Sequence, residues 1–382
     1  MQEITIIGAG FAALTAIKQI RKKDQKSKIT IIAPKAEFIY LPSLIWIPSG
    51  KRQGNDLRIN VSSFFKRNNV DFFAGTVTAI TNGGRTVITD NGDVTNSALL
   101  IASGGRFIKK LPGIEHAITI CEGIEAAEKM RDKIKAMDGG TIALGFGGNP
   151  KEPSAMRGGP MFELLFGLDT QLRQEKRRDK FNLIFFTPAK KPGARLGDAA
   201  VKGILSEIKK RNINTHLGNK MKKFVLNKST NNYTITTEGG EFDTDLIIFM
   251  PGMTGPTFAT KTEMPLSPGG LIQSNMHCQV EGFEHVYVAG DAGSFPGPDW
   301  KPKQAHMADL QAVAAINNML DGLQGKPATH TFKYELACII DSNNKGTLAF
   351  RNEKRTLVIP PCRILHYAKK AFEWMYLRDY RK

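Results

Sequence analysis

The sequence predicts an α/β protein with two interleaved Rossmann-like domains and a C-terminal amphipathic region at a membrane surface. A short apolar strand, a glycine loop and a helix open the chain, and the same order of elements recurs from Thr141. A later strand ends in Gly290-Asp291 and is followed by a helical pattern, so the first domain resumes after an inserted second domain. The predicted boundaries are 1–112 and 250–328 for the first domain, 113–249 for the second, and 329–382 for the C-terminal membrane-attachment region.

The first domain begins with the apolar run Ile4–Ile7, which we expect to form a strand. Residues Ala13–Lys22 follow a helical pattern, and Lys28–Ala33 is typical of the next strand. Turns rich in Asn and Gly separate the strands that we expect further on, which are Val77–Ile80, Thr86–Thr89 and Leu99–Ala102.

The first glycine loop has the sequence context of a dinucleotide site. Gly8 allows a tight turn, Gly10 lets the backbone approach a pyrophosphate, and Ala13 lets the helix pack closely on the strand. The pyrophosphate would lie on the helix N-terminus, where free N–H groups favour an anion. The second strand usually ends in an acidic residue that binds the ribose. Here Lys35 takes that region, and we expect it to contact a phosphate or the ribose instead.

The second domain repeats the pattern but departs from it at the glycine loop. The loop Gly145–Gly148 is followed by Asn149, Pro150 and, three residues later, Pro153, so a regular helix cannot run straight on from it. A nicotinamide dinucleotide would then lose its helix-terminus site. The expected strands are Thr141–Leu144, Phe181–Phe186, Phe224–Leu226, Tyr233–Thr237 and Leu246–Phe249, and the expected helices are Met161–Glu175 and Ala199–Arg211.

Three further segments resemble those of flavoproteins with two dinucleotide-binding domains. The segment 99–105 resembles their apolar strand and turn, the segment 285–291 their second FAD fingerprint, and the segment 302–308 the start of a helix beside the flavin. The resemblance implies FAD as the cofactor, with Asp291 on the ribityl chain and Lys303 near the N1–C2 edge of the flavin. It also implies that FAD is bound by Ala102, Gly104 and Gly290.

Within that group the chain resembles sulfide:quinone oxidoreductases and the flavoprotein subunit of flavocytochrome c sulfide dehydrogenases. The resemblance rests on segments 38–44 with Pro42, 158–164 with Glu163, and 334–350 with Cys338, and on the basic C-terminal helix. It implies that two electrons pass from sulfide or another reduced sulfur species through a cysteine and FAD to a quinone. Two alternatives stay open: a type II NAD(P)H:quinone reductase, and an FAD-binding electron-transfer subunit that has lost sulfide chemistry.

The cysteines bear on this choice. No C-x-x-C pair or zinc spacing occurs among the four, so we expect no metal site and a reducing, cytoplasmic location. The family usually has a cysteine near Met156-Arg157, where this chain has none. We therefore interpret Cys338 as the thiol that faces the flavin and Cys121 as a substitute for its missing partner, although either could be a buried structural thiol. Cys278 and Cys362 are interpreted as structural.

Two residues are candidates for proton transfer. Glu163 matches a family position, and His306 lies on the helix expected beside the flavin, where it could deliver protons to a quinone. A packing role is the alternative for each.

A formal charge of +17 indicates an anionic partner, and without nucleic-acid motifs a membrane surface is the better interpretation. The segment Arg363–Arg378 reads as a basic amphipathic helix that lies on such a surface. The expected partners are a quinone, a reduced sulfur species and the membrane surface, with a homo-oligomer left open and no nucleic acid. The expected apolar face of this helix comprises Ile364, Leu365, Ala368, Ala371, Phe372, Met375 and Tyr376, and the flanking residues are Arg363, Lys369, Lys370, Trp374 and Arg378.

Overall fold

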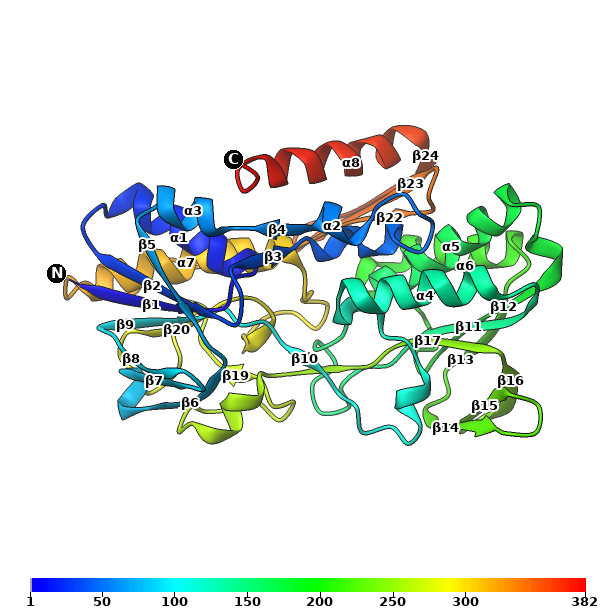
Figure 1. Cartoon of the computed structure of the whole chain (residues 1–382), viewed down its shortest axis with the longest axis horizontal. Coiled ribbons are helices and arrows are strands. Elements are labelled where there is room, and N and C mark those ends of the chain that lie inside the picture. Colours follow the sequence, from blue (N-terminus) through cyan, green and yellow to red (C-terminus); the bar gives the residue numbers. More distant parts are fainter. Residues whose placement is uncertain (1) are drawn as a thin grey trace.

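The computed structural model describes residues 2–382 and contains two parallel sheets, one for each Rossmann-like unit (Figure 1). In Figure 1 the first sheet lies on the left and the second on the right, and extended segments connect them through the middle. Helices cover the upper side of each sheet, and a small antiparallel sheet lies below each. The fold is therefore the mixed α/β class predicted from the sequence.

The first sheet has the strand order β20-β9-β1-β2-β5, and all its pairs are parallel. Strands covered on both faces are nearly continuous apolar runs, as β1 and β9 are here. Its strands are β1 (Glu3–Ile7), β2 (Lys28–Ala33), β5 (Val70–Ala74), β9 (Ala98–Ile101) and β20 (Val286–Val288). Its surroundings include helices α1 (Phe11–Lys23), α3 (Ser62–Arg67) and α7 (Ala305–Gly322), and strands β6 (Val77–Thr81), β7 (Thr86–Thr89) and β8 (Gly92–Thr95).

The second sheet has the order β13-β12-β11-β17 and is also parallel. Helices bury one face of it, and an aromatic cluster that includes Phe186, Phe224 and Phe249 fills the other. Its strands are β11 (Gly140–Phe146), β12 (Phe181–Thr187), β13 (Asn214–Leu217) and β17 (Leu246–Met250). It is covered by helices α4 (Ile124–Ala136), α5 (Gly159–Gln174) and α6 (Asp198–Lys210), and by strands β14 (Met221–Asn227), β15 (Asn232–Thr237) and β16 (Gly240–Thr244).

Short elements link these layers. The pairs β3–β4 and β10–β18 are antiparallel, and β19–β21 is parallel. The bounds are β3 (Glu37–Ile39), α2 (Gly54–Leu57), β4 (Arg58–Asn60), β10 (Arg106–Phe107), β18 (Met253–Thr254), β19 (Ile272–Gln273) and β21 (Gly293–Ser294), with 3-10 turns that include η1 (Leu41–Trp46) and η4 (Ile120–Glu122).

The C-terminal region forms an antiparallel sheet and one long helix. The strands β22 (Glu335–Asp341), β23 (Gly346–Asn352) and β24 (Thr356–Cys362) pair in sequence order. Helix α8 (Arg363–Arg378) follows at once and lies across the top of the molecule in Figure 1. The helix expected here from the sequence is thus confirmed at its predicted bounds.

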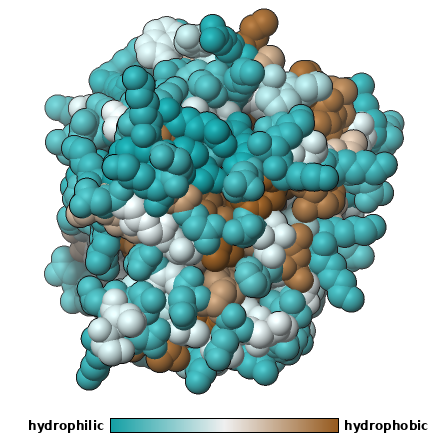
Figure 2. All heavy atoms as spheres, turned by 90° about the vertical axis from the view of Figure 1, so that its right-hand side faces the viewer, coloured by the Kyte–Doolittle hydropathy of each residue, from teal (hydrophilic) through white to brown (hydrophobic). Residues whose placement is uncertain are grey.

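Helix α8 turns polar side chains inward and apolar side chains outward. His366 and Glu373 are buried, whereas Ile364 is 77% exposed and Trp374 60%. In Figure 2, which faces the end of the molecule formed by the second sheet, most of the surface is hydrophilic, and apolar atoms appear at the top, at the upper right and across the middle of the view. The exposed large apolar side chains of α8 and β24 are Leu357, Ile359, Ile364, Tyr367, Phe372, Trp374 and Met375.

Two residues of α8 do not lie where the sequence pattern placed them. Tyr376 was expected on the outer apolar face, but its ring packs on Phe11 at 5.4 Å and its hydroxyl donates to Asp309 at 3.3 Å. Lys369 was expected to flank the outer face, but it pairs with the buried Glu163. The reason is the same for both, because each has a partner from a distant part of the chain.

Candidate active site

The first glycine loop has the conformation that a pyrophosphate site requires. Gly8 has φ +106°, and a Cβ there would lie 2.5 Å from the carbonyl oxygen of Ala102, so only glycine fits between the ends of β1 and β9. Ala13 is fully buried under the loop. Gly10 precedes α1, and a Cβ on it would meet nothing within 4 Å. Open space therefore lies directly before the free N–H groups of α1.

The other residues of the expected FAD site follow β9 and β20 at the same edge of the sheet. Gly104 has φ +73° and also faces open space. The Gly290 N–H donates to Gln311 Oε1 at 2.9 Å. Gln304, at the start of α7, has a buried side-chain oxygen without a hydrogen-bond partner among the described residues. Open space over two glycines and a buried acceptor without a donor fit a bound dinucleotide.

Two further residues lie at the border of this region. Lys35 follows β2 and is exposed, so its side chain is free to contact a phosphate or a ribose. Pro42 occupies the first turn of η1, where the fixed φ angle of proline suits the start of a helix.

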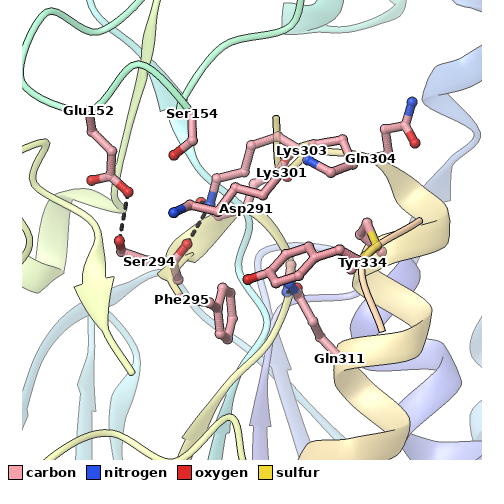
Figure 3. Close-up of a pocket in the computed structure, with 14 residues that line it drawn as sticks. Glu152, Ser154, Asp291, Ser294, Phe295, Lys301, Lys303, Gln304, Gln311 and Tyr334 are labelled. Atoms are coloured by element: carbon pink, nitrogen blue, oxygen red, sulfur yellow. Dashed lines mark hydrogen bonds between the residues drawn. The ribbon is translucent and has the colours of Figure 1, made fainter. Parts of the chain in front are cut away.

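Lys303 lines a partly open pocket whose walls include residues of both Rossmann-like units (Figure 3). Its ammonium group donates to the carbonyl oxygens of Gly293 and Asp291, the latter at 3.3 Å. Burial lowers the pKa of Lys303 to about 8, although Asp291 and Glu152 oppose this change. Figure 3 shows Glu152 on one wall, with its carboxylate accepting from Ser294 Oγ at 2.6 Å.

Arg157 takes the position at which the sequence lacks the expected cysteine. Its guanidinium pairs with Asp291, and its positive charge acts on the thiol of Cys121 and lowers the pKa of that thiol. Burial raises the pKa of Cys121 to about 11, and Arg157 only partly offsets this. Arg157 thus connects the expected ribityl-binding residue to the expected substitute thiol.

Cys338 lies on β22 against the start of α5. A Cβ on Gly159 would lie 3.7 Å from its sulfur, an ordinary contact distance, so the thiol lies next to the first residue of α5. Burial raises the pKa of Cys338 to about 12, and Glu163 raises it further, whereas Lys369 acts in the opposite direction. The resting thiol is therefore protonated at neutral pH.

Glu163 is the carboxyl group that both cysteines share. It is buried on α5, pairs with Lys369 of α8, and acts electrostatically on Cys121 and on Cys338. Burial raises its pKa to about 7, with Lys369 opposing and Asp341 reinforcing the shift. Glu163 can therefore accept or release a proton near neutral pH.

His306, the other candidate for proton transfer, does not lie in this buried region. It is exposed on the first turn of α7, and its Nε2 lies 3.0 Å from a Glu335 carboxylate oxygen. Its neighbours Gln304 and Met307 line the pocket, and His306 is not one of the lining residues.

The second glycine loop is engaged by the protein itself. Asn149 Nδ2 donates to the carbonyl oxygens of Met253 and Gly269, both at 2.9 Å. A Cβ on Gly252 would lie 2.3 Å from the carbonyl carbon of Gly148, so backbone packs on backbone here. Helix α5 begins only at Gly159, as expected from the two prolines.

Sequence reasoning missed several buried polar residues of this region. Asp341 accepts from Trp46 Nε1 at 3.1 Å and lies 2.6 Å from His366 Nδ1, and Glu373 pairs with Arg52 at 2.8 Å. The available signal was the spacing of His366, Lys369 and Glu373 along one side of α8, since polar residues at i, i+3 and i+7 share a helix face. In the described part of the chain, no group of three or more His, Cys, Asp or Glu residues is placed to hold a metal ion.

The two Rossmann-like units, the FAD-type glycine loops and the thiols beside them define an FAD-dependent oxidoreductase. The chain belongs to the pyridine nucleotide-disulphide oxidoreductase family, whose profile matches residues 2–149 and 187–312.

The chain is similar over nearly its whole length to known sulfide oxidoreductases. It is 22% identical to the sulfide-quinone reductase of Aquifex aeolicus, over 98% of this chain and 90% of that protein. The crystal structure of the sulfide:quinone oxidoreductase from Aquifex aeolicus superposes with a TM-score of 0.89 at 20% identity, covering 100% of this chain and 92% of that one. The structure of NDH2 from Plasmodium falciparum in complex with NADH gives a TM-score of 0.75 at 13% identity, with 100% and 96% covered.

Proposed function

We propose that the protein oxidises a reduced sulfur species at Cys338 and passes the electron pair through FAD to a quinone. When bound, FAD supplies the ability to accept two electrons from one partner and give them to another. The observation that carries the proposal is the position of Cys338, which lies against the start of α5 and shares the carboxyl group of Glu163 with Cys121. The similarity to sulfide-quinone reductase over nearly the full chain supports it.

Each residue assigned from the sequence has a role in this proposal. FAD would be held by the residues assigned from the sequence, which are Gly8, Gly10, Ala13, Lys35, Pro42, Ala102, Gly104, Gly290, Asp291 and Lys303. We keep the domain boundaries predicted from the sequence. FAD binds to 1–112 and 250–328, 113–249 is a second unit without a nicotinamide site, and 329–382 attaches to the membrane.

Cys338 must lose its proton to act, because a thiolate is the reactive species. Glu163 is close enough to influence the pKa of Cys338, and its own pKa of about 7 suits a proton acceptor. Lys369 pairs with Glu163 and stabilises its charged form. Cys121 serves as the second thiol, and Arg157 favours its thiolate. His306 is retained only as a surface group that could exchange protons with solvent.

A quinone acceptor requires contact with the lipid that contains it. Helix α8 offers an outward row of Ile364, Phe372, Trp374 and Met375, and Arg363 and Arg378 are exposed at its two ends. Such a helix lies in the headgroup layer with its apolar side down. No helix in the described residues is long and apolar enough to cross a bilayer. We therefore propose a peripheral position on the cytoplasmic face of a membrane.

The alternative donor is NAD(P)H, as in NADH-binding structural relatives. The engagement of Gly148 and Asn149 by the 252–253 segment and Gly269 favours sulfur over NAD(P)H, since a pyrophosphate needs that loop free. Anaerobic stopped-flow mixing tests the choice. Sulfide should bleach the flavin absorbance faster than NADH or NADPH. If either nucleotide bleaches it at catalytic rates while sulfide does not, the proposal is wrong, and if none does, the protein is an electron-transfer subunit.

A further inference from the structure

Two arginines without acidic partners lie beside the cysteine site. Arg195 stands in the short helical turn after β12 and donates to the carbonyl oxygens of Pro153 and Ser154, the latter at 3.1 Å. Arg351 on β23 donates from Nη1 to the carbonyl oxygen of Arg195 at 3.0 Å. Neither guanidinium forms an ion pair with a carboxylate of residues 2–382.

Arg195 is half-buried, and no carboxylate compensates its charge. Burial lowers the pKa of Arg195 to about 10, and no carboxylate counters that effect. A buried cation without a counter-ion destabilises a protein, and a bound anion would relieve the cost. The loop 153–157 that Arg195 holds continues to Arg157 and then to Gly159, which touches Cys338.

Arg351 and Cys338 share one face of the β22–β23 pair. In the register Arg351 lies opposite Leu336, and Ala349 lies opposite Cys338. Residues two apart on a strand point to the same side and are separated by roughly 7 Å. A molecule with two or three carbons between a thiol and an anionic group can span that distance.

The guanidinium of Arg351 is held in place, but some of its N–H groups have no hydrogen-bond acceptor in the described chain. It stacks over the ring of Trp300 at 4.8 Å, and only its Nη1 atom is committed to carbonyl groups of the described chain. The remaining N–H groups match the planar geometry of an oxyanion. Lys301 follows Trp300 in the chain and is a third cation in this region, and Figure 3 shows that it lines the pocket around Lys303 together with Ser154.

We propose that Arg195 and Arg351 bind the oxyanion group of an organic thiol whose sulfur is presented to Cys338. The sulfur substrate of the site is then an anionic organic thiol, with a carboxylate or a phosphate, in preference to bare sulfide. This inference rests on the proposed sulfur chemistry at Cys338. The two thiols are the substrate and Cys338: both S–H bonds break, an S–S bond forms between the two sulfurs, two protons leave, and bound FAD would take the two electrons. A second substrate thiol then displaces Cys338 from this disulfide, which releases the substrate disulfide and restores the Cys338 thiol.

A charge series of small thiols tests the inference on the FAD-loaded protein. Mercaptopropionate carries a carboxylate, mercaptoethyl phosphate a phosphate, mercaptoethanol no charge and cysteamine a positive charge. At equal thiolate concentration one of the two anions should reduce the flavin about tenfold faster than mercaptoethanol. The faster of the two shows whether the substrate carries a carboxylate or a phosphate. Equal rates across the series would overturn the inference while leaving the sulfur chemistry intact.

The variant Arg351→Met should lose the preference for the anion by about tenfold and change the rates with sulfide and mercaptoethanol less than about twofold. Arg355→Met is the matched control, because it removes a cation from the turn of the same hairpin, where Arg355 lies over Phe350. An equal loss for charged and neutral thiols in Arg351→Met would contradict the inference.

Binding without electron transfer gives an independent measurement. The thioether methylthiopropionate cannot reduce FAD, so its heat of binding reports the anion site alone. Calorimetry should detect binding to the wild type and to Arg355→Met, and about tenfold weaker binding to Arg351→Met. Absence of binding to the wild type would overturn the inference. If neither sulfide nor any thiol reduces the flavin, the proposed function fails, and this titration still decides whether the anion site exists.

Discussion

Glu163 of α5 and Lys369 of α8 form a buried ion pair that joins the second Rossmann-like unit to the C-terminal helix. The pair lies beside Cys338, and Asp341 of the same strand is close enough to raise the pKa of Glu163. An ion pair therefore attaches the outer helix α8 to the region around Cys338. The apolar side of α8 faces outward and remains free to contact a membrane or another protein.

Glu163→Gln should change the pH dependence of flavin reduction. Burial holds the pKa of Glu163 near 7, so the carboxylate that accepts a proton from the Cys338 thiol forms only as the pH rises through 7. In the wild type the reduction rate by sulfide should rise across that interval, and in Glu163→Gln it should be about a hundredfold lower without the step at pH 7. Rapid-mixing rates from pH 5.5 to 8.5 measure this, and an unchanged step in the variant would assign it to another group.

The sequence predicts the helices and strands of this protein better than it predicts the partners of its buried charges. Most helices and strands of both Rossmann-like units were predicted within a few residues because their apolar periodicity is local, but α4 and β13 were not predicted. Strand β5 was missed because Val-Asp-Phe-Phe-Ala lacks a clean alternation. The Glu163–Lys369 pair joins residues 206 positions apart, and no local pattern reveals such a partner.

Arg157 illustrates the same limit at a single position. The sequence showed that a cysteine was missing near Met156-Arg157, but not that Arg157 would reach both Asp291 and Cys121. A charged residue gains a buried place only through partners that tertiary structure provides. Glycines were more informative, since only glycine fits at Gly8 beside Ala102, and Gly10 leaves open space before α1.

Gly10→Val should abolish FAD binding without unfolding the protein. The space beside Gly10 is open, so the new side chain would meet no protein atom at its Cβ and would instead fill the place of the pyrophosphate. The purified variant should contain less than about a tenth of the wild-type flavin, with an unchanged far-ultraviolet circular dichroism spectrum. Gly203→Val is the matched control, because Gly203 lies on α6 and its Cβ also faces open space. Full flavin content in Gly10→Val would remove this loop from the FAD site.

Cys338→Ser should retain FAD and lose reduction by sulfide by about a thousandfold, since a hydroxyl cannot replace the thiolate. Cys121→Ser should slow steady-state turnover with a smaller effect on the first reduction. The control is Cys362→Ser at the start of α8, which lies outside the pocket. Reduction at the wild-type rate in Cys338→Ser would exclude Cys338 from the reaction.

Asp309→Asn should stabilise the protein at neutral pH. Asp309 accepts from Thr15 at 2.6 Å and from Tyr376, and burial raises its pKa to about 6. Between its unfolded pKa near 4 and pH 6 the folded state binds more protons than the unfolded state, so this group lowers stability as the pH rises through that window. The melting temperature of the variant should exceed that of the wild type by about 2 °C at pH 7.5. At pH 4 the two should agree, and a difference of the same size there would rule out ionisation of Asp309 as the cause.

The last prediction concerns the outer face of α8. Removing the whole helix is a poor test, because Glu163, Asp341 and Arg52 would lose their partners on α8. The triple variant Phe372→Ser, Trp374→Ser and Met375→Ser changes only side chains that are more than half exposed.

This variant should keep FAD and the wild-type melting temperature but lose binding to anionic liposomes. Burial of the three apolar side chains in the headgroup layer contributes on the order of 2 kcal/mol each, and nearby basic residues add about 1 kcal/mol each. Wild-type protein should float with vesicles that contain phosphatidylserine, and raising the salt concentration should weaken this by screening the basic residues. Arg363→Ser with Arg378→Ser should reduce the salt-dependent part alone, because it leaves the apolar row intact. If the wild type stays in solution even at low salt, the apolar row contacts a protein, and the electron acceptor is then a soluble carrier instead of a membrane quinone.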